Sequence, residues 1–79
     1  MARVLLFGRL GDIAGWREKA VAADTLDGLR RRLGADDCRL AEALLAPGVQ
    51  AAVDRQIVRG DVALTANAEV AFMPAMSGG

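Results

Sequence analysis

The stretch Glu69-Val70-Ala71-Phe72-Met73-Pro74, near the end of a sequence of 79 residues, combines a strand pattern with a stop signal. Its alternation is imperfect, but it places Val70 and Phe72 on the core side of a strand over residues 69–73. Pro74 has no backbone N–H to donate to a neighbouring strand, so the strand ends there. We therefore expect a folded domain over residues 1–73, followed by a flexible, extended tail over residues 74–79.

The segments just before this stretch also predict strands. Residues 49–53 and 57–58 are apolar and flank Asp54-Arg55-Gln56, a turn-like connection whose Asp can bond its own backbone. Residues 62–64 predict a very short strand. The turn over residues 65–68 follows, and Asn67 is the residue there that best tolerates a left-handed conformation.

The first part of the chain reads as a strand pair. Residues 3–7 form an apolar run that stops at Gly8, which is typical of a buried strand. Residues 10–16 predict a turn or a single helical turn. Residues 18–23 predict a weaker strand that pairs with the first as a hairpin.

The middle of the chain predicts two helices. Asp24 or Thr25 can cap the first, which ends at Gly34, and Asp36 or Asp37 can cap the second, which ends at residues 47–48. Leu26, Leu29 and Leu33 recur at helical spacing in the first helix, and the second carries Leu40, Leu44 and Leu45. The order β-β-α-α-β-β-β predicts an α+β domain, a sheet with its helices on one face.

The composition excludes several classes of function. Ten basic residues balance ten acidic ones, and the triplet at residues 30–32 fits a solvated helix face, so neither nucleic acid nor a membrane surface is an expected partner. The chain has no histidine and only one cysteine, Cys38, which excludes His-based catalysis, a His/Cys metal site and an internal disulfide. No apolar run is long enough for a membrane span or a signal peptide, so we expect a cytoplasmic protein.

The tail carries the chemistry that remains. It ends in Gly78-Gly79, and because glycine has no Cβ, such an end can thread a narrow channel into another protein's active site. A carboxylate is a poor electrophile, so the carboxyl group of Gly79 would first need conversion to an acyl-adenylate. The sequence holds no Gly-rich phosphate loop, so an ATP-using partner would have to perform that step.

Three segments resemble the small subunits of molybdopterin synthase, which are sulfur carriers of the ubiquitin-like β-grasp type. They are residues 3–8, residues 49–55 and, most specifically, residues 69–79, which join a Glu-Val-Ala-Phe strand to Pro, a small hydroxyl residue and Gly-Gly. The chain departs from the family at Pro74-Ala75, where members often carry two prolines, and its tail should be somewhat less stiff.

The resemblance implies a cycle in which the chain is a non-catalytic subunit and its partners hold the catalytic residues. An E1-like adenylyltransferase uses ATP to adenylate Gly79, and a sulfur donor protein converts the adenylate to a thiocarboxylate. The tail then enters the large synthase subunit, within a heterotetramer, and donates sulfur to cyclic pyranopterin monophosphate. No tightly bound cofactor or metal is implied.

The same resemblance implies roles for residues near the end of the chain. Gly79 carries the sulfur, while Ser77 and Gly78 form the part of the tail that threads into the partner. Apolar contact with partners would come from Phe72, Met73, Pro74 and Met76. Core packing is an equal alternative for Phe72, because the alternation turns its side chain inward.

Three other functions stay open at this point. A sulfur carrier of the thiamin pathway would share the same end chemistry. A ubiquitin-like modifier would join Gly79 to lysines of other proteins. A plain β-grasp binding module would have an inert tail.

Overall fold

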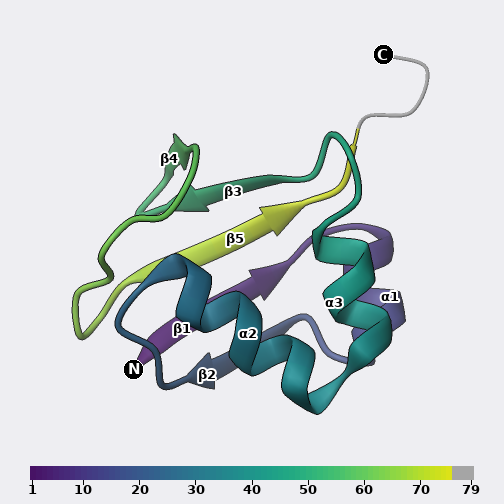
Figure 1. The fold of residues 1–79 in the computed structure, drawn as a ribbon, viewed down its shortest axis with the longest axis horizontal. Helices are drawn as coiled ribbons and strands as arrows, with labels where there is room; N and C mark the ends of the chain where they lie inside the picture. The colour runs from purple at the N-terminus through teal and green to yellow at the C-terminus, as the bar shows by residue number, and fades with distance from the viewer. Residues whose placement is uncertain (76–79) are drawn as a thin grey trace.

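The structure, a computed structural model, describes residues 1–75, and Met76 to Gly79 lie outside the described residues. Strands and helices alternate at first, and two helices then precede the remaining strands (Figure 1). The elements are β1 (Ala2–Leu6), α1 (Arg9–Ala14), β2 (Glu18–Val21), α2 (Leu26–Asp36), α3 (Cys38–Leu44), β3 (Gln50–Val53), β4 (Gln56–Val58) and β5 (Glu69–Met73).

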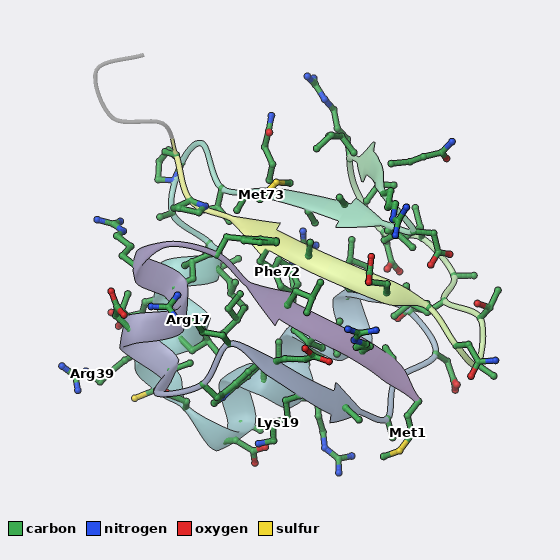
Figure 2. All side chains as sticks on the ribbon, turned by 180° about the vertical axis from the view of Figure 1, so that it is seen from behind. Met1, Arg17, Lys19, Arg39, Phe72 and Met73 are labelled. Carbon is green, nitrogen blue, oxygen red and sulfur yellow. The ribbon has the colours of Figure 1, made fainter. Side chains whose placement is uncertain are left out.

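Within residues 1–75 the strands form one mixed sheet of five strands in the order β2-β1-β5-β3-β4. β5 lies in the centre, parallel to β1 and antiparallel to β3. β1 and β2 pair antiparallel, with Val4 opposite Lys19, which confirms the predicted hairpin. α2 and α3 cover one face of the sheet and leave the other face open (Figure 1, Figure 2).

The core lies between the sheet and these helices. Period-two alternation turns every second strand residue toward it, and Val70 and Phe72 are fully buried there, as the sequence predicts. The guanidinium of Arg30 on α2 stands 5.8 Å from the ring centroid of Phe72. The other large buried side chains come from both layers, and they are Val4, Leu6, Leu10, Leu26, Leu29, Leu33, Leu40 and Leu44.

The helix caps follow the sequence, whereas the predicted end of the first helix is wrong. The Thr25 side chain accepts from the backbone N–H of Gly28, and Asp37 accepts from two N–H groups at the start of α3. α2 does not stop at Gly34 but runs on to Asp36. Gly34 instead permits a close helix contact, because a Cβ there would lie 2.8 Å from the Cβ of Ala41.

The helix content differs from the prediction at two further places. Residues 9–14 form the helix α1, where the sequence predicted a turn or a single helical turn between residues 10 and 16. The second helix was expected to carry Leu45 and to end at residues 47–48, but α3 ends at Leu44, and Leu45 is 78% exposed. Cys38, the first residue of α3, is also exposed.

Residues 62–64 are not a strand of the sheet. Thr25 and Ala63 form an isolated bridge, and Leu64 donates its N–H to the carbonyl of Asp24, so the segment pairs with the residues before α2. These contacts satisfy the backbone of residues 62–64 away from the central sheet.

The left-handed backbone also lies at a different turn from the one predicted. In residues 1–75, the non-glycine residues with positive φ are Asp54 and Arg55, and Asn67 is not among them. Asp54 and Arg55 form a two-residue connection between β3 and β4, which favours positive φ at both positions. The turn at Asn67 is closed by Ala68 donating to Thr65, a pattern that type I turns make without positive φ.

Candidate functional site

The chain leaves the sheet at its centre, where β5 ends at Met73. The last tie to β1 is the N–H of Phe7 donating to the carbonyl of Phe72 at 3.1 Å. Pro74 follows and ends the strand as predicted, since it has no N–H to continue the ladder. The tail therefore starts from a strand that is paired on both sides, which fixes its direction of departure.

Two glycines flank this departure point, one from each neighbouring loop. Gly8, after β1, has φ 57° and ψ −137°, and a Cβ on it would lie 3.0 Å from Cγ of Pro74. Gly48, before β3, has φ 86°, and a Cβ on it would lie 2.7 Å from the Cβ of Ala75. Pro74 and Ala75 thus pass between two backbones that only glycine can bring so close.

An apolar patch lies on the open face of the sheet, next to this exit. The cross-strand register places Leu5, Ala71, Ala52 and Ile57 in one row across four strands. Met73, two residues further along β5, and Phe7, directly after β1, continue the same alternation. We call this set the open-face patch, and its members are Leu5, Phe7, Ala52, Ile57, Ala71 and Met73.

Two side chains of the patch are clearly accessible. Phe7 is 49% and Ile57 is 53% exposed, and the sheet presents this side in Figure 2. Glu18 lies opposite Leu5 at the β2 end of this row, and its carboxylate pairs with the guanidinium of Arg3 across 2.6 Å. An apolar surface of this kind next to a chain exit suits protein–protein contact.

The predicted site residues divide among three environments. Phe72 is fully buried, so of its two alternatives the structure supports core packing rather than partner contact. Met73 and Pro74 are partly exposed at the exit. Met76, Ser77, Gly78 and Gly79 lie outside the described residues.

Four residues of the site were missed from the sequence. Gly8 and Gly48 were interpreted only as stops after a strand and a helix, although a glycine in each loop beside the last strand is a signal of close approach. Phe7 and Ile57 were assigned to strands without a face. Side chains alternate between the two faces of a strand, so Phe7, three positions after the inward-facing Val4, is expected to face outward.

The described residues hold neither a candidate metal cluster nor a candidate membrane span. Among residues 1–75, no group of three or more His, Cys, Asp or Glu side chains could hold a metal ion. In the same part of the chain, no helix is long and apolar enough to cross a membrane. What the described residues do show is that Pro74 and Ala75 leave the sheet beside a partly exposed apolar surface.

Comparison with known proteins gives matches over nearly the whole chain. The ThiS family matches residues 4–79. The molybdopterin synthase sulfur carrier subunit of Escherichia coli K12 is 38% identical over 81 residues, covering all of both chains.

Solved structures of other proteins have a similar fold over nearly the whole chain. Small archaeal modifier protein 1 from Methanosarcina acetivorans has a TM-score of 0.89 at 18% identity, covering 99% of this chain and 95% of that one. CysO from Mycobacterium tuberculosis has a TM-score of 0.83 at 21% identity, covering 96% and 100% of the two chains. These likenesses confirm the predicted ubiquitin-like β-grasp fold. With the family match spanning residues 4–79 and a full-length relative at 38% identity, the chain belongs to the ThiS family.

Proposed function

We propose that this chain is a sulfur carrier in molybdenum cofactor biosynthesis, acting as the small subunit of a molybdopterin synthase in the cytoplasm. The observation that carries the proposal is the 38% identity to the Escherichia coli sulfur carrier subunit over the whole of both chains. The exit at Pro74 supports it, because a strand in the centre of the sheet leads directly into the segment that ends in Gly78-Gly79.

The proposed chemistry takes place at the carboxyl group of Gly79 in two balanced steps. The carboxylate oxygen attacks the α-phosphate of ATP on an E1-like adenylyltransferase, which forms the acyl-adenylate and releases pyrophosphate. Hydrosulfide that a donor protein supplies then attacks the acyl carbon, the bond to AMP breaks as AMP leaves, and loss of the thiol proton gives the thiocarboxylate. Glycine suits both steps, since no side chain crowds the carbonyl carbon.

The chain's own residues would bind the partner and orient the tail. The open-face patch would dock on the large subunit, where Met73 adds an adaptable side chain close to the exit. Pro74, held beside Gly8, would direct the tail toward the partner's active site. Met76 would add apolar contact, and Ser77 and Gly78 would pass through the channel to present Gly79.

The large subunit would hold the catalytic residues and the substrate, cyclic pyranopterin monophosphate, which accepts the sulfur. Two copies of each subunit would form the synthase. The dithiolene needs two sulfur atoms, so the carrier would leave after each transfer and be recharged.

The test is the intact mass of the chain after incubation with a cognate E1-like enzyme, ATP and sodium sulfide. We expect a mass gain that corresponds to the replacement of one oxygen atom by sulfur. Deletion of Gly79 withdraws the carboxyl group by about 3.5 Å, one extended residue, and should abolish the gain. An unchanged wild-type mass, or full gain in the deletion variant, would contradict the proposal.

The alternatives with the same end chemistry separate in two further assays. Adding the chain to extracts that lack either the molybdopterin or the thiamin carrier should restore only molybdopterin synthesis. A modifier would produce isopeptide-linked adducts on denaturing gels, which the proposal does not expect. Full activity of a chain that lacks Gly78 and Gly79 would instead indicate a binding module with an inert tail.

A further inference from the structure

The exit beside Pro74 depends on the orientation of one peptide group. The carbonyl of Gly8 accepts the N–H of Gly11 at 3.2 Å and Nη1 of Arg17 at 3.1 Å. Because the Cα of this glycine approaches the ring of Pro74, any rotation about Gly8 alters the surface against which Pro74 rests. The two donors therefore restrain the peptide group that forms this wall of the exit.

The side chain of Arg17 is itself held at several points. Its Nη2 lies 2.6 Å from Oδ1 of Asp12 on α1, and its backbone carbonyl accepts the N–H of Leu6 at the end of β1 (Figure 2). The planar guanidinium offers donors in a fixed fork, which allows one group to serve Asp12 and Gly8 together.

The sequence also leaves room for this arrangement. A Cβ on Gly11 would lie 2.6 Å from Nη1 and 2.9 Å from Cγ of Arg17. The guanidinium therefore occupies space that any other residue at position 11 would contest. Gly11 is buried beneath it, although the guanidinium itself remains largely exposed.

A role in global stability does not account for these contacts. The side chains of Arg17 and Asp12 are 60% and 72% exposed, and ion pairs of such exposure contribute little to folding. The pair formed by Arg3 and Glu18 has the same 2.6 Å separation and similar exposure, 58% and 55%. Of these two arginines, only Arg17 also donates a hydrogen bond to the loop beside the exit, at the Gly8 carbonyl.

We propose that Arg17 is a positioning residue that aims the tail by holding the Gly8 carbonyl, so that Pro74 leaves the sheet in the direction the partner requires. This inference rests on the proposed function for its catalytic consequence. Its structural half concerns only the geometry of Gly8 and the residues after β5. The two halves can be tested separately.

The structural half is tested by backbone amide NMR spectra of full-length variants, with no enzyme present. Arg17→Met removes the donors and keeps the length of the stem, and Arg3→Met is the matched control. We expect Arg17→Met to shift the amide resonances of Gly8 and Ala75, whereas Arg3→Met should leave both in place. Ala75 reports transmission through Pro74, so an unshifted Ala75 resonance in Arg17→Met would overturn the proposal.

Gly11→Ala provides a second route to the same state without changing Arg17. The added methyl group would displace the guanidinium, and alanine favours helix, so the variant should fold. We expect it to shift the same resonances as Arg17→Met, and the double variant to show no further shift. Additive shifts would contradict a common action through Gly8.

The catalytic half is tested by the kinetics of adenylation with a cognate E1-like enzyme, with the chain as the varied substrate. Arg17→Met should lower kcat about tenfold and leave KM unchanged, because misplacement affects the reacting group rather than docking. Arg17→Lys, which keeps one donor, should recover part of this loss.

The outcomes distinguish the two proposals. No thiocarboxylate on the wild-type chain would overturn the sulfur-carrier function, while the NMR shifts would still decide the positioning claim. Wild-type turnover with an unchanged kcat for Arg17→Met would overturn the role of Arg17 alone. A rise in KM with kcat unchanged would also overturn it, since that result assigns Arg17 to docking.

Discussion

Phe72 and Met73 are adjacent residues of the same central strand, and they lie in opposite environments. Phe72 is fully buried beneath α2, whereas Met73 is partly exposed on the open face beside the exit. The difference follows from the period of two in a strand, which turns neighbouring side chains to opposite faces. One strand therefore packs into the core with one face and leaves its other face partly exposed.

The largest effect should come from the buried face. We expect Phe72→Ala to lower the free energy of unfolding by about 3–5 kcal/mol, through lost burial and the cavity it leaves. Met73→Ala, the control on the next residue, should cost under about 1 kcal/mol. Urea denaturation measures both free energies of unfolding, and equal losses for the two variants would contradict the contrast between the two faces of β5.

Gly8 tests whether the exit belongs to the structural side of this division. Gly8→Ala should cost about 3 kcal/mol, the upper end for strained backbone, because its dihedral angles are strained for alanine and its Cβ would crowd Pro74. Gly15→Ala is the matched control, since Gly15 also has positive φ but has nothing within 4 Å of an added Cβ. It should cost about 1–2 kcal/mol in thermal unfolding. A smaller loss of stability for Gly8→Ala than for Gly15→Ala would show that crowding at Pro74 does not destabilise the fold.

Thr25 caps α2, so a change there is expected to affect stability without affecting docking. Thr25→Ala removes the side chain that accepts from the N–H of Gly28 and should cost about 1 kcal/mol of stability. Because the residue lies away from the open face, the affinity for the large subunit should not change. Calorimetric unfolding and titration measure the two quantities, and a loss of affinity would extend the docking surface beyond the open face.

Ile57 should show the smallest effect on stability and a clear effect on docking. Its side chain is 53% exposed, so Ile57→Ala should change the free energy of unfolding by no more than about 0.5 kcal/mol. Affinity for the large subunit should fall about tenfold, which corresponds to about 1.4 kcal/mol. Unchanged affinity in isothermal titration would place the docking surface elsewhere.

Local pattern was enough to predict much of the body. The alternation at Val70 and Phe72, the stop at Pro74 and the leucines of α2 each act within one element, and the structure confirms them. The resemblance, rather than any periodicity, supplied the arrangement of these elements in a β-grasp sheet.

The rest depended on contacts between distant segments. Gly34 ends no helix because it meets Ala41 of α3, and residues 62–64 pair with the chain before α2 rather than with the sheet. The exit could not be predicted for the same reason. Gly8 and Gly48 become neighbours of Pro74 and Ala75 only after the sheet has formed.

The central claim is that the chain carries sulfur on Gly79 and gives it up to a partner. The most direct test follows the intact mass through one charging step with E1-like enzyme, ATP and sulfide, and one transfer step with the large subunit and cyclic pyranopterin monophosphate. The account predicts a gain of one sulfur in place of oxygen, and then a return to the starting mass as the pterin acquires sulfur. A chain that never gains the sulfur, or that keeps it in the presence of the large subunit and substrate, would contradict the account.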